Sequence, residues 1–159
     1  MNGQSEIIAQ RLREALTPRS MIVGVGNRLR GDDGAGPALV DALGDSVATL
    51  DCGVAPENYL EKIVAAEPDT VLFVDVLEAG GEAGKMRLVE PKDIGDAGLS
   101  THALSLQMAS EYLQARFPVR VLLLGIQPEA LELDSGLSEA VAAAVACAAS
   151  LIVEAVNHA

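Results

Sequence analysis

Short apolar runs alternate with segments whose apolar residues recur every three to four positions. The runs have the length and composition of buried strands, and the segments between them have the spacing of amphipathic helices. The predicted strands are Met21–Val25, Val47–Asp51, Thr70–Val76, Lys85–Glu90 and Val119–Gly125. The predicted helices are Ser5–Leu16, Pro37–Leu43, Asn58–Ala66, His102–Ala115 and Gly136–Val156.

This order of elements predicts an α/β protein: a three-layer α/β/α sandwich around a mostly parallel, about five-stranded central sheet. Thr70–Val76 is the most apolar strand and should be central, whereas Lys85–Glu90 alternates and should lie at an edge. We expect Pro91–Ser100 to be a loop, and Ser100 or Thr101 to cap the helix that follows. Residues 1–159 should form a single domain, with 1–18 as an N-terminal helical extension and 19–157 as its core.

Composition and charge narrow the class of protein. The chain has 159 residues, of which 50% are hydrophobic, and this is enough for one globular domain with a sizeable core. Its net charge of -12 argues against nucleic acid or an anionic membrane as a partner. Cys52 and Cys147 are far apart and the amino end is polar, so we expect reduced thiols and a cytoplasmic location. The apolar stretch Ala140–Val153 is shorter than the roughly 20 residues that span a bilayer.

Polar residues stand where the predicted strands end. A glycine-rich loop after the first strand closes with Asp32 and Asp33, Asp75 ends the central strand, and His102 opens the helix before the last strand. Carboxyl ends of parallel strands meet at one edge of a sheet, and ligand sites of α/β proteins lie there. Asp33, Asp75 and His102 would give an oxygen, oxygen, nitrogen set that suits nickel or zinc. Each residue also has an ordinary structural explanation: Asp33 could be a turn residue, Asp75 a buried acid with a partner, and His102 the start of a helix. The other histidine, His158, is expected to be inert.

The glycine loop also suggests a different class of enzyme. Gly24-Val25-Gly26 begins like a dinucleotide-binding fingerprint, but Leu29 stands where that fingerprint needs a small residue. Arg28 and Arg30 could still meet an anion. A nucleotide- or nucleoside-handling α/β enzyme is therefore an alternative.

Five segments in order resemble one known family. The stretch from Gly24-Val25-Gly26-Asn27 to Gly31-Asp32-Asp33-Gly34-Ala35-Gly36-Pro37 resembles the opening motif of the [NiFe]-hydrogenase maturation endopeptidases. The remaining matches are Leu50–Gly53, Phe73–Asp75, Ser100–His102 and Gly125–Glu129. Together they cover roughly residues 20–157, and the resemblance implies a phosphorylase/hydrolase-like sandwich.

The resemblance implies a reaction and a set of site residues. Such a protein would act on a hydrogenase large-subunit precursor that already carries nickel, and would remove a short C-terminal extension. Asp33, Asp75 and His102 would be the residues that recognise this nickel, which the substrate presents, and zinc or cadmium could replace it. Asp33 and Asp51 would be the catalytic carboxylates.

Several mechanisms fit these residues. Asp51 or Asp33 could act as a general base on water, or the metal could polarise the scissile carbonyl or activate the water. Cys52, which stands where some members have glycine, is the one thiol that could serve as a nucleophile, because Cys147 lies in an alanine-rich helix. A non-catalytic metal-centre-sensing chaperone is a further alternative, which Asp51→Asn would distinguish from a protease.

Overall fold

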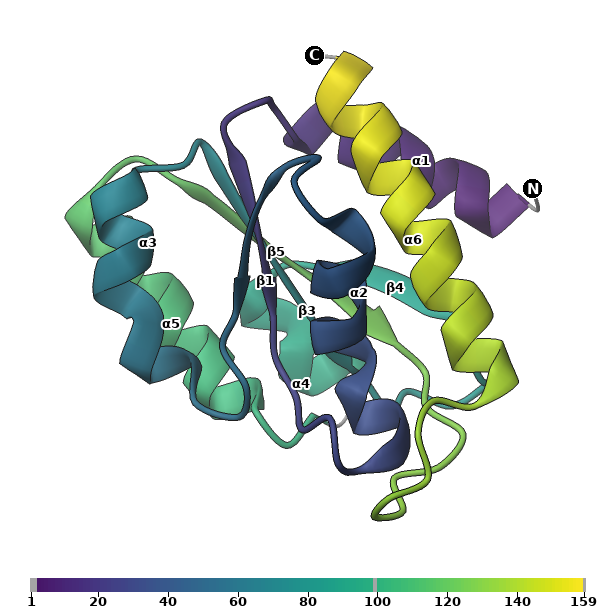
Figure 1. The fold of residues 1–159 in the computed structure, drawn as a ribbon. Helices are drawn as coiled ribbons and strands as arrows, with labels where there is room; N and C mark the ends of the chain where they lie inside the picture. Colours follow the sequence, from purple (N-terminus) through teal and green to yellow (C-terminus); the bar gives the residue numbers. More distant parts are fainter. Residues whose placement is uncertain (1–2, 99, 159) are drawn as a thin grey trace.

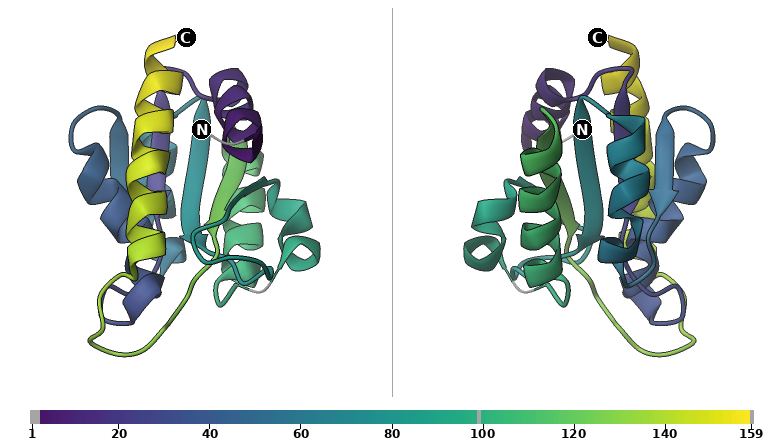
Figure 2. Two further views of the ribbon diagram at one scale, coloured as in Figure 1. Left: turned by 90° about the vertical axis from the view of Figure 1, so that its right-hand side faces the viewer. Right: turned by 90° about the vertical axis from the view of Figure 1, so that its left-hand side faces the viewer.

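The protein is a three-layer α/β/α sandwich in the computed structural model, which describes residues 3–98 and 100–158 (Figures 1 and 2). The sheet has the strand order β2-β1-β3-β5-β4. These strands are β1 (Ser20–Gly24), β2 (Ala48–Asp51), β3 (Thr70–Val76), β4 (Met86–Val89) and β5 (Arg120–Ile126). All neighbours pair in parallel except β4, which runs antiparallel to β5 at the edge. The predicted fold class, the central strand and the edge strand are thus confirmed.

Helices cover both faces of the sheet. One face carries α1 (Gly3–Ala15), α2 (Ala35–Leu43) and α6 (Glu139–His158), and the other carries α3 (Leu60–Ala66), α4 (Ile94–Ala97) and α5 (Ala103–Arg116). The short 3-10 helices are η1 (Gly31–Gly34), η2 (Pro56–Tyr59) and η3 (Pro91–Asp93). In each strand successive side chains point to opposite faces, so the sheet divides the core into two layers.

The alternation along β3 positions the site. Leu72 and Val74 point to the layer under α2 and α6, whereas Val71 and Phe73 point to the layer under α5. By the same period of two, Asp75 lies on the α5 face. The last acid of the central strand therefore faces the helix that His102 precedes.

The N-terminal helix α1 packs into the same core. Ile8 and Leu12 are buried with side chains of α6 and the sheet. Arg11 donates from Nη1 to the Leu88 carbonyl at 2.6 Å, and Gln4 donates from Nε2 to the Met86 carbonyl at 3.1 Å. These bonds go to backbone of the edge strand β4, whose outer side would otherwise be open to pairing with another chain.

Helix α6 is longer than the apolar stretch that the sequence indicated. It has 20 residues, and within the described residues it is the one helix long and apolar enough to cross a membrane by length and composition. One of its faces, including Ala148 and Ile152, is buried against α1 and α2. A long core helix has these same properties.

Three details differ from the sequence-based expectations. Pro91–Ser100 is not all loop, because Pro91 begins η3 and a short helix, α4, follows it. Neither Ser100 nor Thr101 caps α5; His102 is the residue before the helix, and no side chain caps it. The helical spacing predicted Leu104, Met108, Leu113 and Ala115 as the apolar positions of this helix. Leu113 is buried, but Leu104 and Met108 are 69% and 60% exposed, because Leu106 lies on the buried side instead.

Candidate active site

Two glycines allow the loop after β1 to fold tightly. Gly26 has φ +143°, and a Cβ there would lie 1.9 Å from the Asp33 carbonyl oxygen. A Cβ on Gly36 would lie 2.4 Å from the Val74 carbonyl oxygen, since the start of α2 rests directly on the sheet. No side chain fits at Gly26 or Gly36, because the backbone of another segment lies too close. These two glycines therefore allow η1, with its two aspartates, to sit at the carboxyl ends of β1 and β3.

Asp33 is buried in η1. Its side chain is 3% exposed, and Oδ2 accepts the Asn27 N–H at 2.9 Å. This bond closes the loop after β1 upon itself and fixes the direction of the carboxylate.

Asp75 and His102 are in direct contact. His102 Nδ1 lies 2.9 Å from Asp75 Oδ2, and both side chains are buried. Asp75 also accepts the Val76 N–H on Oδ1 at 2.8 Å and the Ser100 hydroxyl on Oδ2 at 3.1 Å. Ser100 Oγ in turn accepts the His102 N–H at 3.1 Å. Since Nδ1 of His102 faces Asp75, Nε2 is the ring nitrogen that a metal or substrate could meet.

The electrostatics of this pair follow from its burial. Burial raises the pKa of Asp75, against the effect of its hydrogen bond with His102. The same hydrogen bond raises the pKa of His102, and burial opposes it. The Asp33 charge contributes to raising the pKa of both groups, so Asp33 is within electrostatic reach of the pair.

Asp33, Asp75 and His102 share one edge of the sheet, but they do not form a ready-made metal site. Within residues 3–98 and 100–158, no three His, Cys, Asp or Glu side chains converge closely enough to hold an ion as they stand. Asp75 and His102 satisfy each other instead. Two buried carboxylates and an imidazole fit the donor preferences of a divalent ion, and their metal role stays a prediction.

Asp32 has a structural role that the sequence analysis did not identify. Its buried carboxylate accepts the N–H groups of Glu129, Ala130 and Ser138 at 2.7, 3.0 and 2.7 Å, and the Ser138 hydroxyl at 3.0 Å. Burial would raise the pKa of Asp32, but these donors outweigh it and the pKa is lowered. Asp32 therefore fastens the segment between β5 and α6 to η1.

Gln127 is a further buried polar residue at this edge. It donates from Nε2 to Glu78 Oε1 at 2.7 Å and accepts the Ala79 N–H on Oε1 at 2.9 Å. Through these bonds the end of β5 holds the segment that follows β3. Its place in the segment Gly125–Glu129 was the signal in the sequence, although no role could be read from it.

Asp51 lies at the same edge but away from the Asp75–His102 pair. It is in register with Gly24 of β1, which is in register with Val74 of β3. Strands are about 4.8 Å apart, so Asp51 lies about 10 Å from Val74 across the sheet. Val74 points to the α2 layer, so Asp51, which shares its register across the sheet, lies on that face too, whereas Asp75 faces α5. Of the two predicted catalytic carboxylates, Asp33 is therefore one of the predicted metal ligands and Asp51 is apart from them.

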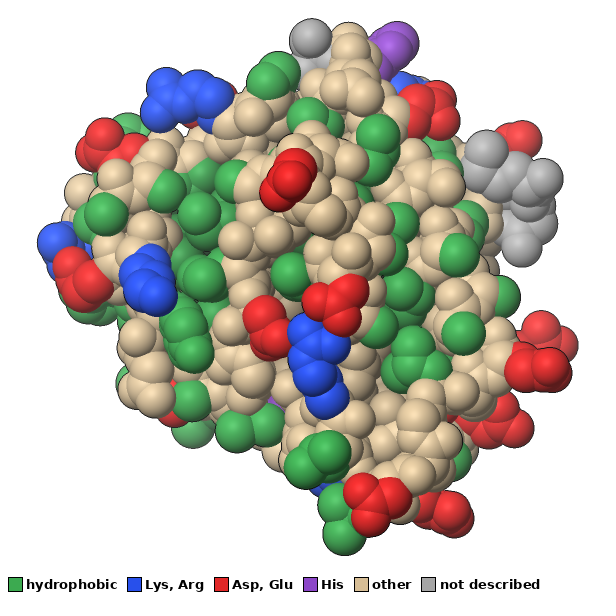
Figure 3. Space-filling view, in the orientation of Figure 1, with side chains coloured by type: hydrophobic (Ala, Val, Ile, Leu, Met, Phe, Trp, Pro, Cys, Tyr) green, Lys and Arg blue, Asp and Glu red, His purple; other side chains and the backbone are tan. Residues whose placement is uncertain are grey.

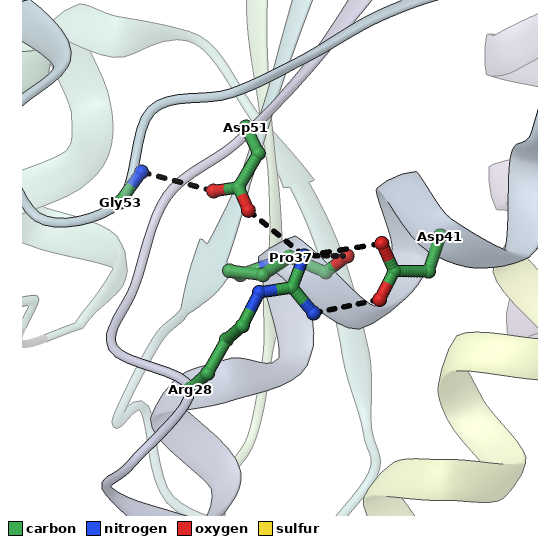
Figure 4. Close-up of polar contacts among 5 residues, drawn as sticks. All are labelled: Arg28, Pro37, Asp41, Asp51 and Gly53. Atoms are coloured by element: carbon green, nitrogen blue, oxygen red, sulfur yellow. Dashed lines mark hydrogen bonds and ion pairs between the residues drawn. The ribbon is translucent and has the colours of Figure 1, made fainter.

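Arg28 binds Asp51 together with Asp41 (Figure 4). Arg28 Nη2 lies 2.8 Å from Asp51 Oδ2, and Nη1 lies 2.6 Å from Asp41 Oδ2. The other oxygen of Asp51, Oδ1, accepts the Gly53 N–H at 3.0 Å. Figure 3 shows this face of the molecule, where a basic side chain is flanked by acidic ones. Arg28 is therefore already paired with two carboxylates and does not offer a free cation to a nucleotide.

Cys52 is a poor candidate for a nucleophile. Its side chain is buried, and burial, together with the charges of Asp51 and Glu57, raises the pKa of its thiol to about 12. The thiolate is the reactive form of cysteine, so at neutral pH Cys52 stays protonated.

Comparisons with known proteins agree with this architecture. The family model for hydrogenase maturation proteases matches residues 39–155. The chain is 36% identical over 110 residues to the hydrogenase 3 maturation protease of Escherichia coli (strain K12), which covers 66% of this chain and 70% of that protein.

Solved structures extend the likeness to almost the whole chain. The crystal structure of the [NiFe] hydrogenase maturation protease HycI from Thermococcus kodakarensis KOD1 matches with a TM-score of 0.83 and 32% identity, over 95% of this chain and 99% of that one. The hydrogenase maturating endopeptidase HybD from E. coli matches with a TM-score of 0.71 and 28% identity, over 84% and 89% of the two chains.

Proposed function

The chain belongs to the hydrogenase maturation protease family, and from this premise we propose that it is an endopeptidase that removes a C-terminal extension from the large-subunit precursor of a [NiFe] hydrogenase. We propose further that nickel already held by the precursor is the feature it recognises. The observation that carries the proposal is the buried Asp75–His102 pair with Asp33 beside it, at the carboxyl edge of the sheet.

The chemistry of these three residues suits a metal that arrives with the substrate. They offer oxygen and nitrogen donors without a thiolate, so they should hold a free divalent ion weakly, yet could complete the shell of one that substrate cysteines already bind. His102 could donate through Nε2, and the Asp33 and Asp75 carboxylates could contribute oxygens once their present hydrogen bonds are exchanged. Zinc or cadmium could take the place of nickel in a binding experiment.

The two candidate bases differ in their surroundings. Asp33 is buried beside the Asp75–His102 pair, which suits a metal ligand, whereas the Asp51 side chain is 33% exposed and water can reach it. Each carboxylate oxygen has a second lone pair, so Asp51 can accept a proton even though both oxygens are hydrogen-bonded. We therefore assign the general base to Asp51: it takes a proton from water as the water oxygen adds to the scissile carbonyl, and it then gives this proton to the leaving nitrogen as the C–N bond breaks, which frees the extension as an amine. A metal at that carbonyl would lower the same barrier.

The alternatives have less support. A nucleotide-handling enzyme would use Arg28 and Arg30 with the glycine loop, but Arg28 is paired with Asp41 and Asp51. A non-catalytic sensor of the metal centre would use Asp33, Asp75 and His102 but not Asp51.

The unpaired cysteines Cys52 and Cys147 support a cytoplasmic location for the reaction.

A cleavage assay tests the proposal. The protein is mixed with a nickel-loaded large-subunit precursor and with the same precursor lacking nickel, and the mass of the precursor is followed. We expect loss of the extension from the loaded form only. Asp51→Asn should still bind the loaded precursor without cutting it; full cleavage by this variant would exclude Asp51 as the base.

A further inference from the structure

Arg28 joins three segments of the chain around one guanidinium group. It comes from the loop after β1, and its partners are Asp41 on α2 and Asp51 at the end of β2 (Figure 4). Both terminal nitrogens contact Asp41, at 2.6 Å from Nη1 and 3.1 Å from Nη2, while Nη2 also contacts Asp51 at 2.8 Å. Nη2 also lies 3.5 Å from the Pro37 carbonyl oxygen.

The ion pairs themselves contribute little to stability. The side chains of Arg28, Asp41 and Asp51 are 48%, 62% and 33% exposed. Pairs as exposed as these are screened by water, so their attraction adds little to stability. What the arrangement supplies is geometry, since the planar guanidinium fixes the direction of every bond it makes.

Asp41 and Asp51 have different roles toward Arg28. The two bonds to Asp41 hold the plane of the guanidinium against α2, a rigid element. The single bond to Asp51 then holds one carboxylate oxygen, and the Gly53 N–H holds the other at 3.0 Å. The Asp51 carboxylate is thus fixed from two sides, and it lines a pocket together with Gly26 and Val54.

We propose that Arg28 is a positioning residue for peptide cleavage, which holds the Asp51 carboxylate, through the anchor Asp41, in the orientation in which it accepts a proton from water. This inference rests on the proposed function with Asp51 as the base. Arg28 acts through Asp51 and touches no reacting atom in this arrangement. A misplaced catalytic group loses much of its effect even when it is still present, so the orientation of Asp51 should govern the rate of the chemical step.

Kinetics of the intact protein on nickel-loaded precursor test this role. Arg28→Gln should lower kcat about tenfold or more while KM stays within about twofold, because orientation affects the chemical step and not binding. Arg28→Lys keeps the charge but cannot make the fork of bonds, so it should restore only part of kcat. Arg30→Gln removes a neighbouring arginine of the same loop and should leave kcat unchanged.

A spectroscopic readout reports the placement of Asp51 without any cleavage. The Gly53 N–H donates to Asp51, so its amide signal in an NMR spectrum is sensitive to where that carboxylate lies. Arg28→Gln should shift or broaden the Gly53 signal, Asp41→Asn should do so to a smaller extent, and Arg30→Gln should leave it in place.

The outcomes separate this inference from the proposed function. An active wild type together with an equally active, or more active, Arg28→Gln variant would overturn the positioning role alone. The same loss of kcat in Arg30→Gln would also overturn it, because the effect would then come from charge in the loop. A wild type that cuts no nickel-loaded precursor would contradict the proposed function and, with it, the role of Arg28.

Discussion

His102 Nδ1 lies 2.9 Å from Asp75 Oδ2, so the start of α5 is tied to the end of β3 through two buried side chains. The contact has a simple origin in the sheet. The alternation along β3 turns Asp75 toward α5, and the turn before α5 brings His102 over the edge of the sheet. The Ser100 hydroxyl donates to the same oxygen of Asp75 that His102 contacts. A buried pair of titratable groups held in this way is well suited to respond to pH and to an incoming metal.

The first prediction concerns the protonation of His102. Its hydrogen bond with Asp75 raises its pKa above the ordinary value of 6.5, so the free protein should titrate at this residue above pH 6.5. A ring must be neutral at Nε2 to bind a metal, so cleavage should fall as the pH drops through this raised pKa. NMR titration of the two histidine rings measures it: Asp75→Asn should lower the pKa of His102, and His102→Ala assigns the signal.

The same interaction has a defined effect on stability. Because the folded protein holds the His102 proton more tightly than the unfolded chain, the stabilisation is complete below the unfolded pKa of about 6.5 and is lost as the pH rises through the folded pKa. The difference in unfolding free energy between wild type and His102→Ala should therefore shrink above that pH. A difference that grew with pH would mean that the pairing with Asp75 does not favour the protonated ring.

The second prediction separates the two adjacent aspartates. Asp32→Asn replaces a carboxylate that accepts three N–H groups and a hydroxyl, and should lower the unfolding free energy by about 2 kcal/mol or more in urea. Asp33→Asn loses one N–H bond to a charged acceptor and should cost less stability, while it should abolish cleavage. Equal losses of stability for both variants would contradict the structural role given to Asp32.

The contribution of Asp32 also has a defined pH window. Its pKa is lowered in the fold, so its stabilisation is present above the unfolded value of 3.8 and is lost as the pH falls through the lower folded pKa. Acid unfolding curves of wild type and Asp32→Asn should therefore converge at low pH.

The third prediction is that Cys52 has no catalytic role. Cys52→Ala should keep kcat within about twofold of wild type, because a thiol with a pKa raised to about 12 supplies almost no thiolate at neutral pH. The folded protein should also react slowly with iodoacetamide at Cys52, as measured by mass spectrometry, and quickly after unfolding. Loss of cleavage in Cys52→Ala with an unchanged Tm would reverse this assignment.

The fourth prediction tests the close approach of α2 to the sheet. Gly36→Ala places a methyl group 2.4 Å from the Val74 carbonyl oxygen, so the chain must shift, and we expect a loss of about 3 kcal/mol or more in unfolding free energy. Gly95→Ala is the matched control, because nothing lies within 4 Å of a Cβ there. If the two variants were equally stable, the packing of α2 on Val74 would be looser than described.

Much of the fold was predictable because it depends on local pattern. The apolar run of β3 and the alternation of β4 gave their places in the sheet, and the sites at strand ends followed from the parallel order. The buried side of α5 was only partly predictable. Leu113 was expected among the apolar positions and is buried, but Leu104 and Met108 were expected there too and are exposed, because packing on the sheet selects Leu106 instead. The short helix α4 has too few residues to show a period.

The roles of Asp32 and Arg28 lay beyond the sequence for a different reason. Asp32 is satisfied by Glu129, Ala130 and Ser138, which are 97, 98 and 106 positions away, and nothing local marks these contacts. Arg28 and Asp51 meet because β1 and β2 are neighbours, and a sequence pattern that suggests an anion site gives no sign that two carboxylates already fill it. A long-range polar contact of a single residue produces no periodic pattern in the sequence, so it cannot be predicted from one.

The most direct test of the central claim is the mass of a large-subunit precursor after incubation with this protein, measured with and without nickel in the precursor. Our account predicts loss of the C-terminal extension from the nickel-loaded form alone, and no loss from either form with His102→Ala. Cleavage of the nickel-free precursor at the same rate, or undiminished cleavage of the loaded form by His102→Ala, would contradict it.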